Sequence, residues 1–296
     1  MEISLKIQEI QQRLQEHEID GWLIFDNHAS NRFAHTLLAI PEHLMLTRRF
    51  FYWIPKEGGP KKVVHRIEEE HLSFLPGEQF LYLSWRDLDE ALAKILLGAK
   101  RVAMEYSPHC MNPYVSTVDG GTIEQIRDLG VEVISSDDLL QHFTSVLDEE
   151  QIESHLQAAA VLEDVVGKAW ELIADKVRHD KRITEYDVQK FIISEFMAHN
   201  CIADYGPICA VNGHSSLPHY MALKKRCQEI VRGDFVLIDL WCKKDLPYAI
   251  YADITRVAVV ASDATPRQHE VFQTVRNAQK KGYEFIKKRF EKGEPV

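Results

Sequence analysis

Residues 235–260, FVLIDLWCKKDLPYAIYADITRVAVV, contain two apolar runs that each carry a single carboxylate. Asp239 is the acidic residue of the first run, and Asp253 is that of the second. The segment between the runs begins CKKDLP and has the charge and the proline typical of a hairpin loop. The stretch therefore predicts two paired, otherwise buried strands with one aspartate in the interior of each.

The two aspartates allow two interpretations, because a buried carboxylate without a partner is costly in an apolar setting. In the first, Arg256 or Lys243 neutralises one aspartate and water satisfies the other. Strand residues alternate between faces, so Asp253 and Thr255 share a face and Arg256 points to the other. In the second, a divalent cation separates the two carboxylates, which otherwise repel. We favour the second, because hard oxygen ligands suit divalent metals and a metal pair can activate water.

The segments on both sides of this stretch predict further helices and strands. Upstream, residues 148–177 show the amphipathic pattern of a long helix without proline, and a second helix begins after a capping-box-like Thr184. Downstream, a last helix is expected over residues 266–292, with a proline in its first turn. The first 148 residues alternate helix and strand signals, so the fold class is a mixed α/β (α+β) protein.

Composition and length limit what the chain can be. Its 296 residues suggest two domains, and the composition changes near residue 148, so we predict domains at 1–147 and 148–296. The net charge of −10, from 35 basic and 45 acidic residues, argues against a nucleic-acid partner. No apolar run is long enough for a membrane span, and no signal peptide is recognisable. Five cysteines without a C-x-x-C pair indicate reduced thiols, and we expect a cytoplasmic protein.

Three motifs in the second half of the chain resemble one enzyme family. They are NGHSSLPHY at 212–220, RGDFVLID at 232–239 and YADITR at 251–256. In this order they are similar to the pita-bread metallopeptidases, which include Xaa-Pro aminopeptidases, prolidases, creatinases and methionine aminopeptidases. The resemblance implies a creatinase-type N-terminal α/β domain followed by a pita-bread catalytic domain.

The resemblance also implies roles for individual residues. Asp239 and Asp253 fall on the first two metal ligands of the family, and His219 falls on its catalytic histidine, which contacts the substrate and stabilises the tetrahedral intermediate. His214 and Tyr220 are expected to line the same pocket and to bind substrate. The implied cofactors are two divalent metal ions, Mn, Co or Zn. The implied substrate is a peptide with proline after the scissile bond, and a homodimer is left open.

Two departures from the family pattern bear on activity. The 14 positions between Asp239 and Asp253 make a longer hairpin than the family's. The family's third metal ligand, a histidine, and two later glutamates have no counterpart in the chain. We therefore expect a C-terminally truncated catalytic domain, a fragment that binds metal weakly and is inactive alone. Two explanations stay open at this point: the missing half lies on another chain, or the sequence is a truncated or frameshifted reading of a longer gene.

Other functions share this architecture and stay open at this stage. A non-catalytic pita-bread module that binds peptide or protein is one alternative, and the retention of both aspartates argues against it. A creatinase-type amidinohydrolase acting on a small molecule is the other. Whether the chain itself is an enzyme is therefore undecided by the sequence.

Overall fold

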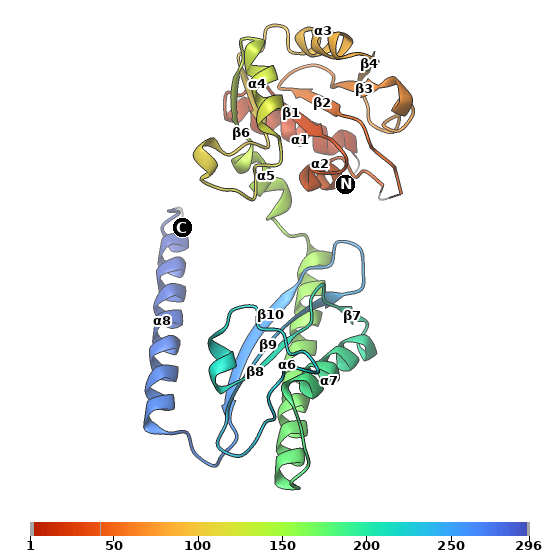
Figure 1. The fold of residues 1–296 in the computed structure, drawn as a ribbon. Helices are drawn as coiled ribbons and strands as arrows, with labels where there is room; N and C mark the ends of the chain where they lie inside the picture. Colours follow the sequence, from red (N-terminus) through yellow and green to blue (C-terminus); the bar gives the residue numbers. More distant parts are fainter. Residues whose placement is uncertain (1–2, 42, 295–296) are drawn as a thin grey trace. The chain divides into compact units, whose positions relative to one another are not determined.

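The computed structural model describes residues 3–41 and 43–294, and the chain divides into two compact units (Figure 1). Unit 1 comprises Met1–Val146 and unit 2 comprises Leu147–Val296. Both units mix helices and strands, so the predicted mixed α/β fold class is confirmed. None of the helices in the described residues is long and apolar enough to cross a membrane.

Unit 1 is built on a six-stranded sheet with the strand order β4-β3-β2-β1-β5-β6. Strands β1, β2 and β3 pair in antiparallel fashion, whereas β4, β5 and β6 join their neighbours in parallel. The central strand β1 is a continuous apolar run that ends in an aspartate, and all its residues are buried. The strands are β1 (Gly21–Asp26), β2 (Phe50–Pro55), β3 (Lys61–His65), β4 (Glu78–Tyr82), β5 (Arg101–Met104) and β6 (Glu132–Ser135).

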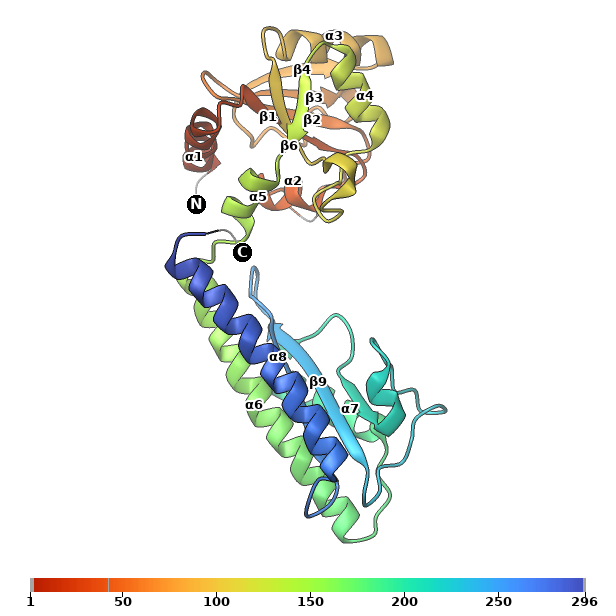
Figure 2. The same ribbon diagram turned by 90° about the vertical axis from the view of Figure 1, so that its left-hand side faces the viewer.

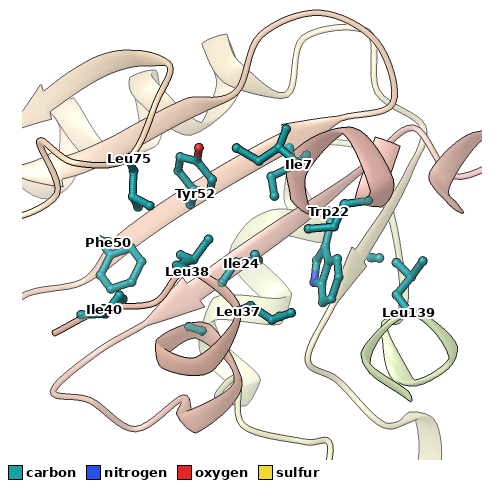
Figure 3. Packing of buried hydrophobic residues seen from close by; sticks show 14 of the residues in the cluster. Ile7, Trp22, Ile24, Leu37, Leu38, Ile40, Phe50, Tyr52, Leu75 and Leu139 are labelled. Atoms are coloured by element: carbon teal, nitrogen blue, oxygen red, sulfur yellow. The ribbon is translucent and has the colours of Figure 1, made fainter. Parts of the chain in front are cut away.

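Helices cover both faces of this sheet. Alternate residues of β1 divide between the faces, with Trp22 and Ile24 in one apolar cluster and Leu23 and Phe25 in the other. Figure 3 shows the first cluster, which includes residues of α1, α2 and α5; the second includes residues of α3 and α4. The helices are α1 (Ile3–Glu16), α2 (Arg32–Leu37), α3 (Trp85–Ile95), α4 (Gly120–Asp128) and α5 (Asp137–Thr144), with short 3₁₀ turns η1 (Arg66–Glu68) and η2 (Pro108–Cys110).

Unit 2 contains a smaller antiparallel sheet in which β9 is the central strand. Its partner on one side is β10, and on the other side it pairs with β8 and then with the short β7. The strands are β7 (Cys201–Ile202), β8 (Ile208–Val211), β9 (Phe235–Lys244) and β10 (Ala252–Val259). The helices are α6 (Glu149–Arg178), α7 (Glu185–Ala198) and α8 (Pro266–Glu291), and η3 (Asn212–Ser216) is a 3₁₀ segment. The predicted long helix, capping box and terminal helix are confirmed.

Only one face of β9 is buried. Val236, Ile238, Leu240 and Cys242 alternate along the strand and belong to the same apolar cluster as residues of α6 and α7. Figures 1 and 2 show α6 running along the sheet, whereas α8 buries none of its described side chains. The expectation that both strands are buried apart from their aspartates is therefore wrong. A run of apolar letters does not tell whether helices cover one face of a strand or both.

Candidate metal-binding site

The two sequence-predicted ligand residues lie on the same open face of the β9–β10 hairpin. In the antiparallel register Asp239 is opposite Thr255, and Asp253 is opposite Trp241. Residues two apart on a strand share a face, so Asp253 is a diagonal neighbour of Asp239. Asp239 is half-buried and Asp253 is exposed. The structure thus brings the two carboxylates together where solvent and ions can reach them.

The electrostatics of the pair are those of two like charges. Loss of hydration raises the pKa of Asp253, and the negative charge of Asp239 raises it further. The hydroxyl of Thr255 donates a hydrogen bond to Oδ1 of Asp239 and so orients that carboxylate. Within residues 3–41 and 43–294, no ion pair neutralises either aspartate.

The alternative counter-charges, Arg256 and Lys243, are engaged elsewhere. Arg256 pairs with Ile238 of β9, whose side chain lies on the covered face, and its guanidinium forms an ion pair with Glu163 of α6. The Nζ of Lys243 lies 5.2 Å from the centre of the Tyr251 ring. The interpretation in which one of these residues neutralises an aspartate is therefore not supported.

The donor set suits one hard cation. Two carboxylates on neighbouring strands offer oxygen ligands to a divalent ion, and the ion would remove the repulsion that raises the pKa of Asp253. In the part of the chain that the structure describes, no group of three or more histidine, cysteine, aspartate or glutamate side chains could hold a metal. Asp239 and Asp253 therefore fit as part of a metal site and do not enclose an ion by themselves.

The predicted catalytic histidine lies on the segment between β8 and β9. His219 is exposed and adopts a left-handed backbone conformation with φ of 57°. Asn212, which begins the segment, donates to Oδ1 of Asp234 at 2.8 Å and accepts from the N–H of Phe235 at 2.9 Å. These bonds join the first motif to the second. Among the described residues, no hydrogen bond or ion pair links His219 to either aspartate, and its role stays a prediction.

His214 and Tyr220 come together, but around a residue that the sequence interpretation overlooked. Their rings stack with centroids 4.4 Å apart, and both side chains bond to the carboxylate of Glu185, which has no exposed surface. Glu185 is the first residue of α7, where an acidic residue is ordinarily explained by the helix dipole. The sequence did carry a signal that Glu185 is buried, because it lies on the same helix face as the buried Val188, Gln189 and Ile192.

Comparisons with known proteins place this arrangement in context. Residues 153–294 match metallopeptidase family M24. The Xaa-Pro dipeptidase of Pyrococcus horikoshii is 31% identical over 220 residues, which are 73% of this chain and 54% of that protein. The Xaa-Pro aminopeptidase of Haemophilus influenzae is 32% identical over 104 residues, which are 34% of this chain and 23% of that protein.

Solved structures show the same fold. The prolidase of Pyrococcus horikoshii has a TM-score of 0.57 and 23% identity, over 93% of this chain and 70% of that chain. The dipeptidase PepE of Mycobacterium ulcerans has a TM-score of 0.68 and 17% identity, over 94% of this chain and 70% of that chain. The resemblance to the pita-bread metallopeptidases is thereby confirmed, with residues 153–294 matching metallopeptidase family M24 and the solved structures sharing the fold. The chain matches about half the length of the curated dipeptidase.

Proposed function

We propose that the chain forms part of a metal-dependent hydrolase of the aminopeptidase type, which with its full set of metal ligands cleaves peptides before a proline. Asp239 and Asp253 would be metal ligands, and His219 would contact the substrate. The proposal depends chiefly on the two carboxylates sharing the open face of β9 and β10, inside the region that matches family M24. The named activities of the dipeptidase and aminopeptidase relatives support the substrate class.

The protein's own residues would act by holding and orienting groups. Asp239, oriented by the Thr255 hydroxyl, and Asp253 would hold the cations, for which we propose Mn, Co or Zn. A bound metal pair supplies a hydroxide nucleophile and polarises the peptide carbonyl. The imidazole of His219 would donate a hydrogen bond to the oxygen that becomes negatively charged. The five free cysteines support a reducing compartment, and we place the protein in the cytoplasm.

We further propose that residues 1–296 alone bind metal weakly and do not hydrolyse peptides. Two carboxylates offer too few ligands to fix two ions around one hydroxide. The dissociation constant for Mn²⁺ should accordingly be high, about 10⁻⁴ to 10⁻³ M or above, the range of the weakest oxygen-ligand sites for Ca²⁺.

Titration calorimetry with Mn²⁺ tests the site, and an Xaa-Pro dipeptide assay tests the activity. Asp253→Asn should abolish the weak Mn²⁺ binding, whereas His219→Ala, a matched change outside the carboxylate pair, should leave it unchanged. Unaltered Mn²⁺ binding by Asp253→Asn would remove the pair from the proposal. Robust dipeptide hydrolysis by residues 1–296 that Asp253→Ala abolishes would overturn the expectation of inactivity.

A further inference from the structure

Glu185 places a buried carboxylate at the centre of four hydrogen-bond donors. Its Oε1 accepts from the N–H of Val211 at 2.7 Å and lies 2.9 Å from Nδ1 of His214. Its Oε2 accepts from the hydroxyl of Tyr220 at 2.6 Å and from the N–H of Gln228 at 2.7 Å. The side chain of Glu185 has no exposed surface. A buried charge of this kind is tolerated because both oxygens are fully satisfied.

These donors extend from Val211, the last residue of β8, to Gln228, and so cover most of the segment between β8 and β9 that carries His219. They lie 26, 29, 35 and 43 residues from Glu185 in the sequence, so they are spread along residues 211–228. Besides the 3₁₀ segment η3, residues 212–228 contain no helix or strand. Two of these residues, Asn212 and His219, have positive φ angles, which a chain keeps only where its surroundings impose them. The hydrogen bonds to the Glu185 carboxylate therefore help to fix the conformation of this segment.

The two oxygens of Glu185 cannot be replaced by an amide. Each oxygen accepts from a main-chain N–H, that of Val211 on one side and that of Gln228 on the other. A glutamine has one oxygen and one NH₂ group, so in either orientation its NH₂ meets a fixed N–H donor. The hydroxyl of Tyr220 could rotate to accommodate the change, but a main-chain N–H could not. The arrangement thus requires a carboxylate, and a side chain of the same shape is not sufficient.

We propose that Glu185 is a positioning residue that fixes segment 212–228 and thereby holds His219 in place for substrate. It touches neither the proposed metal ligands nor a reacting atom, and it acts through His214, Tyr220 and the main chain. The consequence for His219 rests on the proposed function, whereas the anchoring of the segment does not. The two parts can therefore fail separately.

Hydrogen exchange of residues 1–296 tests the anchoring. Glu185→Gln should accelerate exchange at least about tenfold across 212–228, and the His219 ring resonances should change in a carbon–proton NMR spectrum. Glu195→Gln is the matched control, because Glu195 lies on the same helix and bonds to Lys168 at its surface. It should alter neither measurement. Exchange in 212–228 within twofold of the control would overturn the anchoring.

If Glu185→Gln unfolds unit 2, Tyr220→Phe is the second variant that tests the anchoring. This variant removes one donor to Oε2, together with the weaker 3.3 Å hydrogen bond of the same hydroxyl to the main-chain oxygen of Arg226, and leaves the two main-chain bonds in place. It should accelerate exchange several-fold within 212–228, with β9 unaffected, and wild-type protection there would contradict the anchoring. If the segment loosens while the His219 resonances stay unchanged, the anchoring stands and the positioning of His219 is wrong. A loosened segment together with altered resonances supports both parts, whatever the peptidase assay shows.

Discussion

The two sheets of this chain differ in how many of their faces are covered by other parts of the protein. In unit 1, β1 is buried throughout, and apolar clusters cover both faces of the sheet. In unit 2, β9 alternates buried and half-buried residues, and one face is covered by α6 and α7. An acidic group on a covered sheet must find its partners inside the protein, whereas one on an open face can take a cation from solvent. The open face is therefore where ion chemistry can occur.

Glu105 of unit 1 and the aspartates of unit 2 illustrate this contrast. Glu105 has no exposed surface and accepts from the indole N–H of Trp22 at 2.6 Å and the amide of Asn31 at 2.7 Å, with the Ser136 hydroxyl at 3.2 Å. Burial nevertheless raises its pKa to about 7. Among the residues that the structure describes, the Thr255 hydroxyl on Asp239 is the one side-chain donor to Asp239 or Asp253. Glu105 is therefore satisfied by hydrogen bonds within the protein, whereas the two aspartates lie on a face that solvent reaches.

The largest expected effect comes from removing side-chain volume on the covered face of β9. Leu240 has no exposed surface, and Leu240→Ala should lower the free energy of unfolding of unit 2 by about 2–5 kcal/mol, because it leaves a cavity. Leu237 lies on the open face of the same strand and is only half-buried. Leu237→Ala should cost at most about 1 kcal/mol, as changes at partly exposed sites usually do.

Native-state hydrogen exchange, read at the β9 and β10 amides, measures both leucine variants in the same unit. Leu237 and Leu240 are the same residue type on one strand, so the contrast depends on the covering of the two faces. Equal losses would mean that the face carrying the aspartates is also packed, and the comparison between the sheets would fail.

The second effect is a pH dependence in unit 1. Because the folded-state pKa of Glu105 is raised from 4.5 to about 7, the folded state binds more protons than the unfolded state between these values. The free energy of unfolding should therefore fall by about 3 kcal/mol as the pH rises from about 4.5 to 7, at 1.36 kcal/mol per pKa unit. Urea unfolding, followed by fluorescence of the buried Trp22 and Trp53, measures it.

Glu105→Gln should flatten this slope, whatever it does to the absolute stability. Glu124→Gln on α4 of the same unit is a suitable control, because Glu124 is exposed, and it should keep the slope. A slope that persists in Glu105→Gln would assign the pH dependence to another group.

Much of the architecture was predictable from local pattern, and the exceptions have a physical reason. Helices α6 and α8 follow from long amphipathic stretches with capping residues, and the β9–β10 hairpin follows from two apolar runs around a polar loop. The open face of β9 did not follow, because Phe235, Leu237 and Trp241 on that face are as apolar as their buried neighbours. Which face a helix covers is decided by residues far away in the sequence.

In the candidate site, too, some residues were predictable from the sequence and others were not. Asp239 and Asp253 were recognisable because each is a lone carboxylate in an apolar strand. Glu185 was not, because an acidic residue in the first turn of a helix has a local explanation and its partners lie 26 to 43 residues further on. Residue spacing also gives no position for His219 relative to the aspartates, since an irregular segment has no period from which direction can be calculated.

A third effect contrasts two glycines. A Cβ added to Gly21 of β1 would collide with the ring of Trp53 and lie 2.7 Å from the main-chain oxygen of Ile54. Gly21→Ala should therefore destabilise unit 1 by about 1–3 kcal/mol through overpacking. Gly167 of α6 is exposed, and its added Cβ would meet nothing within 4 Å, so Gly167→Ala should stabilise unit 2 by about 0.5–1 kcal/mol. Thermal unfolding of both variants gives the signs, and equal signs would contradict the argument.

The smallest expected effect is a gain in the free energy of unfolding, whereas the changes on the covered sheet lower it. Asp239→Asn removes the charge that raises the pKa of Asp253 and keeps an oxygen for the Thr255 hydroxyl. It should raise the free energy of unfolding of unit 2 by about 0.2–0.5 kcal/mol at pH 7 and low salt, because like charges on neighbouring strands repel. Asp245→Asn, in the exposed hairpin loop, is the matched control and should have no such effect. The gain should vanish in about 1 M salt, where charges are screened within about 3 Å. A loss of stability, or a gain that survives high salt, would mean that repulsion does not govern the pair, and the need for a cation between the two carboxylates would lose its physical basis.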